Sequence, residues 1–256
     1  MMSRHPESRS TADAPAGVAS APSPVRPHEP AAPTLRTTAL ALLWVAAISA
    51  LVLATFIAAM FAIPNASQHL VDGLALTILI QGSLSTLALV TVARRRGVHL
   101  AALGCVRPTR RMAHLLWQVP LILLAAVLVQ GMMVALSDGA AEEGGTQLTA
   151  DLAGANPAFA LAGFLGIALV TPFWEELAFR GLLFGSVRHR WGTTAAVLTT
   201  SIIFAAVHLF PLLMPYLIAL GCGAAWLRLF HRNIWAPISL HVVVNSIAGG
   251  VVLTAL

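Results

Sequence analysis

Three short clusters of polar residues in the C-terminal part of the chain have the types and the spacing of a hydrolytic centre. The clusters are Glu175-Glu176 with Arg180, Phe204 with His208, and His241 with Asn245. Each lies in a stretch apolar enough to cross a bilayer, where a charged side chain costs roughly 2.5–3.5 kcal/mol even on lenient insertion scales. Because such groups rarely persist in hydrocarbon without a role, we expect the clusters to form one buried reaction centre.

The chemistry that these residues suggest is hydrolysis by an activated water molecule. A carboxylate without a cation partner in a low-dielectric site can act as a general base near neutral pH. Glu175 together with His208 could therefore hold and deprotonate a water molecule. His241 and Asn245 could donate hydrogen bonds to the oxyanion that forms on a peptide carbonyl.

Helical spacing suggests supporting roles for the other members of the clusters. Glu176 and Arg180 are one helical turn apart, so they can form an ion pair on one face, which is most simply structural. Phe204 lies one turn before His208 and is expected to pack against it and position it. Structural contacts between helices remain an alternative role for the histidines and for Asn245.

The composition identifies an integral membrane protein. Of the 256 residues, 58% are hydrophobic and only 10% are charged, and the mean hydropathy is +0.83. A soluble domain carries about 25% charged residues. All 15 basic residues are Arg, and they are scattered between hydrophobic stretches, which argues against a nucleic-acid partner. Two cysteines are too few for a disulfide framework or a four-thiolate metal site.

Seven apolar stretches are long enough, or nearly so, to cross ~30 Å of hydrocarbon. They cover about 37–63, 71–93, 113–136, 158–186, 193–210, 212–230 and 234–255. We therefore expect an all-α bundle of about seven transmembrane helices with a buried polar site. Helical rise places Glu175, His208, His241 and Asn245 near the middle of their spans, so the three clusters can converge.

The chain divides into a tail and two groups of predicted helices. Residues 1–35 hold seven of the 15 prolines and are predicted to be a disordered cytoplasmic tail. Residues 36–140 carry the first three spans, and residues 157–256 carry the core with the polar clusters. Arginines occur before the first span and after the second, fourth and sixth. By the positive-inside rule, we expect an inner (plasma) membrane protein with a cytoplasmic N-terminus and an external C-terminus.

The clusters resemble the motifs of the CAAX protease and bacteriocin-processing family, abbreviated CPBP or ABI. The motifs are Glu175-Glu-Leu-Ala-Phe-Arg180, Phe204-Ala-Ala-Val-His208 and His241-Val-Val-Val-Asn245, in this order on successive predicted helices. Members of the family are intramembrane glutamic endopeptidases and their bacterial relatives. The resemblance implies that Glu175 is the catalytic base with His208, that His241 and Asn245 form the oxyanion site, and that Glu176 and Arg180 support the site.

The resemblance implies neither a metal nor another cofactor, and it implies a membrane-associated peptide or protein as substrate. Eukaryotic members remove the last three residues from prenylated CAAX proteins. Bacterial relatives are linked to peptide maturation, bacteriocin immunity or regulated membrane proteolysis. The Arg-only, Ala-rich sequence is typical of a bacterial chain.

Other functions stay open at this point. A metal-dependent hydrolase could use the Glu, His and Asn side chains as zinc ligands, although the sequence lacks the His-Glu-x-x-His motif. A non-catalytic bacteriocin-immunity or membrane scaffold protein could use the same polar centre to bind a peptide or a partner protein. A transporter is less favoured, because the two halves of the sequence show no repeat.

Overall fold

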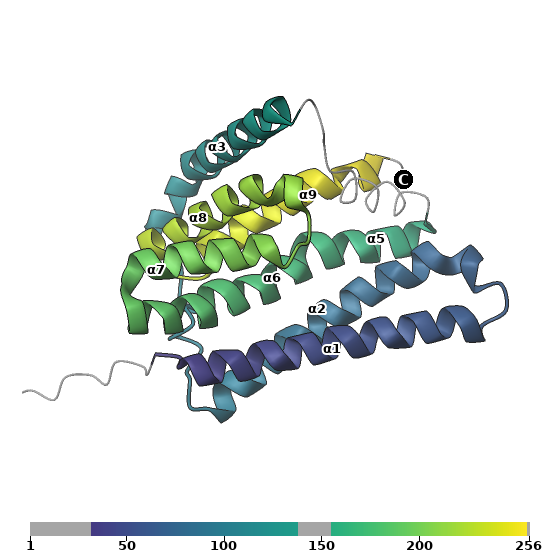
Figure 1. Cartoon of the computed structure of the whole chain (residues 1–256). Helices are drawn as coiled ribbons and strands as arrows, with labels where there is room; N and C mark the ends of the chain where they lie inside the picture. The colour runs from purple at the N-terminus through teal and green to yellow at the C-terminus, as the bar shows by residue number, and fades with distance from the viewer. Residues whose placement is uncertain (1–31, 138–154, 255–256) are drawn as a thin grey trace, which may run out of the picture.

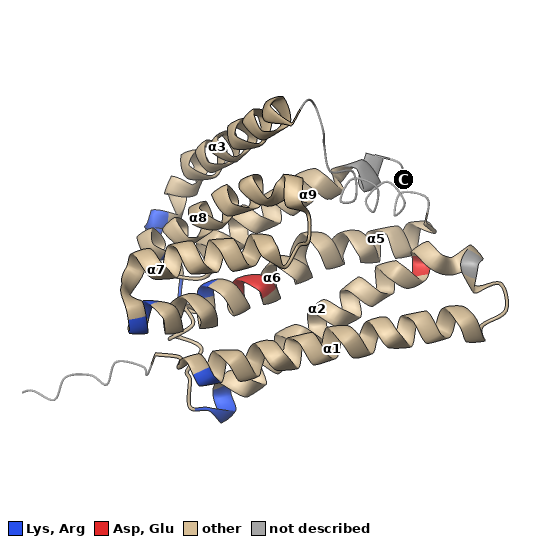
Figure 2. Cartoon of the chain, viewed as in Figure 1, with Lys and Arg blue, Asp and Glu red and all other residues tan. Residues whose placement is uncertain are grey.

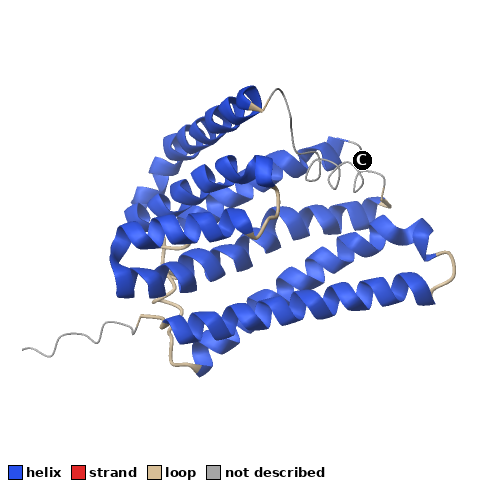
Figure 3. Cartoon of the chain, in the orientation of Figure 1, coloured by secondary structure: helices blue, strands red, loops and turns tan. Residues whose placement is uncertain are grey.

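The structure is a computed structural model that describes residues 32–137 and 155–254. Both ranges consist of helices joined by loops, and neither contains a strand (Figure 3). The prediction of an all-α fold is therefore confirmed. The predicted cytoplasmic tail lies almost entirely outside the described residues, as does most of the loop before the core.

Five segments of the described chain are long and apolar enough to cross a membrane. They are Leu35–Ala62, Leu70–Arg95, Arg110–Leu136, Pro157–Ala206 and Pro211–His231. The fourth segment contains two of the predicted spans, and Gly192 separates them with φ 86° and ψ 178°, a backbone conformation that favours glycine. A multi-pass helical membrane protein is thus confirmed, while seven crossings remain a prediction.

The first half of the chain supplies one helical hairpin and one outlying helix (Figure 1). Helix α1 (Leu35–Ala62) and helix α2 (Leu70–Arg95) lie side by side and are joined by a turn that contains η1 (Ala66–His69). Helix α3 (Leu115–Leu136) follows η2 (Arg110–His114) and packs on α8 at the opposite side of the molecule.

The second half of the chain forms the centre of the bundle. Its elements are α5 (Pro157–Leu165), η3 (Gly166–Val170), α6 (Thr171–Glu176), η4 (Leu177–Leu183), α7 (Phe184–Ala206), η5 (Pro211–Leu213), α8 (Met214–His231) and α9 (Trp235–Thr254). Helices α7 and α8 pack closely together, and α9 lies against α5, η3 and α6. This arrangement brings the three motif-bearing segments around a common interior space.

Glycine allows the close approach of α7 and α8. A Cβ atom added at Gly221 on α8 would lie only 2.9 Å from the Cα atom of Ser201 on α7. The interior around this contact is apolar and includes Leu177, Phe204 and Leu217. The outer surface is also apolar, with Phe61 89% and Leu116 83% exposed, as expected where side chains meet lipid rather than water.

Charges are separated along the bundle. The described arginines other than Arg180 gather at one end (Figure 2). The described residues include only three acidic side chains, Asp72, Glu175 and Glu176. Asp72 lies in the first turn of α2 and Arg94 and Arg95 in its last turn, at opposite ends of the helix. The two glutamates are therefore the acidic groups in the interior of the described bundle.

Candidate active site

The helix that carries Glu175 and Glu176 is irregular on both sides of them. The two glutamates end α6, a six-residue α-helix that lies between the π-helical segments η3 and η4. A π-helical turn pairs each N–H with the carbonyl five residues back, and such turns occur frequently at functional sites. The motif spacing predicts a regular helix here, and it does not reveal the π-helical turns on either side of the two glutamates.

Pro172 explains how Asn245 is attached to this helix. In η3 the N–H of Thr171 donates to the carbonyl of Gly166, so the next carbonyl, that of Ile167, would pair with the N–H of residue 172. Proline has no N–H. The side-chain amide of Asn245 instead donates to the Ile167 carbonyl at 2.9 Å, and this bond joins α9 to the helix of the two glutamates.

Arg180 and Glu176 form a buried ion pair, as their four-residue spacing predicts. Arg180 Nη1 donates to Glu176 Oε1 at 2.8 Å, and both side chains are 1% exposed. Arg180 Nη2 also donates to the carbonyl of Gly221 on α8 at 3.2 Å. The guanidinium carbon lies 4.6 Å from the centroid of the Phe204 ring, within the range of a cation–π contact. Arg180 therefore links η4 to α7 and α8.

His241 contacts both glutamates. Its Nδ1 atom lies 3.1 Å from Glu176 Oε1, and its Nε2 atom lies 3.7 Å from Glu175 Oε2. Its ring also meets the Phe204 ring edge to face, with centroids 5.6 Å apart. The motifs predict that His241 faces the substrate oxyanion, whereas both of its ring nitrogens are directed at carboxylates in the structure.

Glu175 is buried but incompletely paired. The residue is 8% exposed, and its Oε2 atom is buried without a hydrogen-bond partner among the described residues. Buried polar atoms in folded proteins nearly always have a partner, which can be an ordered water. A water molecule or a substrate group in the adjoining cavity would satisfy this oxygen.

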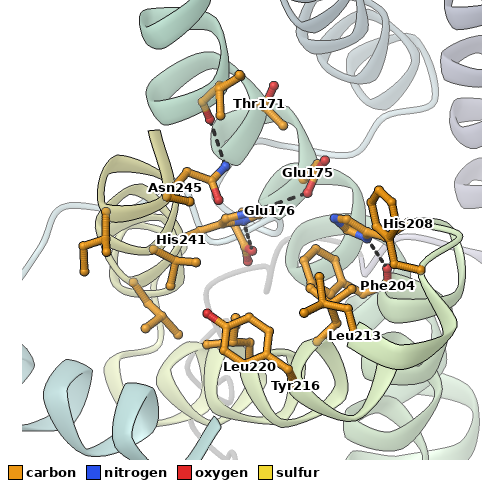
Figure 4. A pocket seen from close by; sticks show the side chains of 18 of the residues that line it. Thr171, Glu175, Glu176, Phe204, His208, Leu213, Tyr216, Leu220, His241 and Asn245 are labelled. Atoms are coloured by element: carbon orange, nitrogen blue, oxygen red, sulfur yellow. Dashed lines mark hydrogen bonds and ion pairs between the residues drawn. The ribbon is translucent and has the colours of Figure 1, made fainter. Parts of the chain in front are cut away.

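His208 presents one ring nitrogen to the cavity that adjoins Glu175. Its Nδ1 atom lies 2.7 Å from the Phe204 carbonyl. Because a carbonyl oxygen can only accept, Nδ1 carries the proton, and Nε2 of the neutral ring is left as an acceptor. The side chains of His208 and Glu175 point toward one another across the pocket (Figure 4).

All seven residues singled out in the sequence line one cavity of about 500 Å³. The rest of the lining is mainly apolar, with side chains such as Leu213, Leu217 and Leu240. Tyr216 on α8 also points into the cavity (Figure 4). Tyr216 belongs to none of the three motifs, so their spacing does not predict it as a site residue. Among the described residues, no group of three His, Cys, Asp or Glu side chains could hold a metal ion.

The helical membrane fold and the polar cavity with two glutamates and two histidines define a candidate membrane peptidase. Comparison with known families supports this class, because residues 157–247 match the family described as type II CAAX prenyl endopeptidase Rce1-like. The match over this region supports the CAAX protease family that the three motifs predicted.

A curated bacterial protein also matches the chain. Over 79 residues it is 32% identical to the "Putative membrane peptidase YdiL" of Bacillus subtilis (strain 168). The match covers 31% of this chain and 32% of that protein, so the chain spans about a third of the length of this relative. No solved structure matches the chain.

Proposed function

We propose that this chain is an intramembrane endopeptidase of the glutamic type that hydrolyses a peptide bond in a membrane-associated peptide or protein. The observation that carries the proposal is the buried carboxylate of Glu175, whose Oε2 atom makes no hydrogen bond to a described residue and which faces His208 across the polar part of the cavity. The Rce1-like match over residues 157–247 supports the same class of reaction.

In the proposed reaction, Glu175 and the Nε2 atom of His208 hold one water molecule. Glu175 accepts a proton from this water as its oxygen attacks the carbonyl carbon of the scissile bond. The carbonyl oxygen becomes an oxyanion. Collapse of this tetrahedral intermediate breaks the carbon–nitrogen bond, and the proton held by Glu175 passes to the leaving amine. The products are a new carboxyl terminus and a new amino terminus.

Asn245 and His241 have different capacities to stabilise the oxyanion. Asn245 uses one amide N–H for the Ile167 carbonyl, and an amide group carries two. The second N–H can therefore donate to the oxyanion. His241 can donate from Nε2 only when that nitrogen carries a proton, and in the structure this nitrogen lies 3.7 Å from Glu175 Oε2. Glu176, Arg180 and Phe204 hold these groups in place.

The surroundings of the site suit a substrate that reaches it from the membrane. Apart from the polar groups, side chains such as Leu213, Leu220 and Val244 line the cavity, and they favour an apolar segment. We propose that the protein lies in the plasma membrane with its arginine-rich end in the cytoplasm. Residues 36–140 would then form the N-terminal helices, and residues 157–256 would form the catalytic core.

The test compares the wild type with Glu175→Gln at matched expression levels in a deletion strain, followed by mapping of new protein termini in membrane and secreted fractions. New termini with the wild type alone would support peptide hydrolysis and identify substrates. If both proteins rescue the deletion phenotype and give the same termini, the proposal fails in favour of a binding role.

Metal dependence is tested on the same preparations. Cleavage of an identified substrate should be unchanged by 1,10-phenanthroline, because the proposed water activation uses only Glu175 and His208. Loss of cleavage with the chelator, and its recovery with added zinc, would favour a metal-dependent hydrolase.

A further inference from the structure

A hydrophobic groove of about 470 Å³ lies between α1 and α2, away from the candidate active site. Its lining residues are Leu40, Trp44 and Ile48 on α1, and Leu84, Leu87, Ala88, Thr91, Val92 and Arg95 on α2, with Arg96 directly after that helix. The α1 residues are four positions apart, and the α2 residues recur at three- and four-residue intervals, so each set follows one face of its helix. Because Ala88 and Thr91 are small, the two helices leave a hollow between them.

The two ends of this groove differ in chemistry. Arg95 and Arg96 line one end and are exposed, whereas the remainder is almost entirely apolar. No ion pair joins either arginine to another described residue. The described acidic residues are all remote, since Asp72 begins α2 and the two glutamates line the active-site cavity. The positive charge at this end of the groove therefore lacks a protein counter-charge within the described chain.

The length of the groove matches one leaflet of a bilayer. From Arg95 to Leu84 the helix rises by roughly 16 Å, and half of a hydrocarbon core is roughly 15 Å. A molecule with an anionic group at the arginines could therefore lay an acyl chain along the groove down to about the middle of the membrane. Trp44 and Leu87, which are 53% and 62% exposed, would contact that chain.

We propose that the groove between α1 and α2 binds an anionic phospholipid, with its phosphate at Arg95 and Arg96 and one acyl chain along Trp44, Leu84 and Leu87. Guanidinium groups bind phosphate through several N–H donors, and basic pockets between membrane helices recognise anionic lipid headgroups. The site is independent of the proposed peptide hydrolysis. It would anchor the α1–α2 hairpin to the leaflet on the arginine-rich side.

The test is native mass spectrometry of the full-length protein in detergent, with phosphatidylglycerol and phosphatidylcholine of identical acyl chains. The wild type should retain phosphatidylglycerol preferentially. The Arg95→Gln/Arg96→Gln variant should lose affinity for it by a factor on the order of ten, from the loss of two charges near the anionic headgroup. Arg107→Gln/Arg110→Gln removes the same charge from exposed sites outside the groove, and this control should keep the preference.

A second pair of variants tests the acyl-chain contact. Leu87→Ala should weaken retention of both lipids, whereas Leu128→Ala should not, although Leu128 on α3 is similarly exposed at 64%. Equal retention of the two lipids by the wild type would overturn the proposal, as would an equal loss in the two arginine variants. The proposal would also fail if inorganic phosphate alone raised the melting temperature of the protein as much as phosphatidylglycerol does. The site would then bind a free anion and would not need the acyl chain.

Discussion

The side-chain amide of Asn245 donates a hydrogen bond to the backbone carbonyl of Ile167, 2.9 Å away. This bond joins α9 to the helix that carries Glu175 and Glu176. It forms where the π-helical register of η3 meets Pro172, the position at which a backbone donor is missing. Because Pro172 has no N–H, the Ile167 carbonyl is left free to accept from Asn245, which we propose as an oxyanion donor.

Pro172→Ala should lower the activity without preventing folding. The new N–H at residue 172 can compete with Asn245 for the Ile167 carbonyl. Weakening a hydrogen bond worth about 1 kcal/mol corresponds to about a fivefold loss in rate. The turnover of wild type and variant should be compared at saturating substrate, with melting temperatures measured on the same samples.

Pro120→Ala is the matched control, because Pro120 is also a proline inside a helix, on α3, and does not line the active-site cavity. Its turnover should equal that of the wild type. Equal turnover of Pro172→Ala and Pro120→Ala would show that the missing N–H has no role in positioning Asn245.

Arg180→Ala should reduce the amount of folded protein. The substitution leaves Glu176 as a buried charge without its guanidinium partner, and breaking a buried ion pair in this way costs about 3–5 kcal/mol. The measurements are the monodisperse fraction after detergent extraction and the melting temperature. Arg188→Ala removes an exposed arginine and should behave like the wild type.

A double variant separates charge from packing at this ion pair. Adding Glu176→Gln to Arg180→Ala removes the uncompensated carboxylate, so the double variant should accumulate better than Arg180→Ala alone. If the double variant is no better than the single one, the loss comes from the missing contacts of Arg180 with Gly221 and Phe204.

The sequence predicted which residues would meet, but not how they would contact one another. The high cost of charge in hydrocarbon singled out Glu175, Glu176 and Arg180, and the depth of each residue in its span allowed His208 and His241 to converge with them. The four-residue spacing of Glu176 and Arg180 was sufficient to predict their ion pair, because residues four apart lie on the same face of a helix.

Contacts between helices could not be derived in the same way. The position of His241 between two carboxylates depends on the rotation of α9 relative to α6, which periodicity does not fix. The contribution of Tyr216 to the cavity likewise depends on how α8 faces α7 and α9. One local signal was available, since a proline at position 172 inside an apolar span leaves a carbonyl without its backbone donor.

Gly221→Ala should destabilise the packing of α7 on α8. The added Cβ atom would lie 2.9 Å from the Cα and the Cβ of Ser201, so one of the backbones must shift. Overpacking of this kind costs about 1–3 kcal/mol. Because the Gly221 carbonyl also accepts from Arg180, activity should fall together with the melting temperature.

The control for this prediction is Gly131→Ala on α3, where the added Cβ atom meets nothing within 4 Å. Alanine in a helix is favoured over glycine by about 0.5–1 kcal/mol, so this variant should melt at or slightly above the wild-type temperature. If the two variants melt alike, the close approach at Gly221 does not limit packing.

Cys105 gives a pH-dependent test of the loop between α2 and η2. Burial raises the pKa of its thiol, and the nearby Arg228 guanidinium partly opposes this shift. At a pH below the pKa, the folded protein therefore has less thiolate than the unfolded chain and should react more slowly with iodoacetamide. The difference should close as the pH rises through the folded-state pKa.

The measurement uses a Cys222→Ser background, so that Cys105 is the only thiol. Arg228→Gln removes the group that lowers the pKa and should slow the alkylation of folded protein further at a given pH. Equal alkylation rates for folded and SDS-unfolded protein at every pH would contradict the burial of Cys105 in this loop.

His208 provides the most direct test of the proposed water-binding geometry. Its Nδ1 atom is occupied by the Phe204 carbonyl, so only Nε2 can contact the water. The amide nitrogen of Asn can replace Nδ1, whereas the longer Gln side chain can reach the position of Nε2. His208→Asn should therefore lose activity by about 5- to 150-fold, which corresponds to about 1–3 kcal/mol for the lost hydrogen bond to the water. His208→Gln should retain more activity because it still offers the water a hydrogen bond, and the reverse order would place the reacting water on the other nitrogen. Both rates should be measured at saturating substrate on samples with matched melting temperatures.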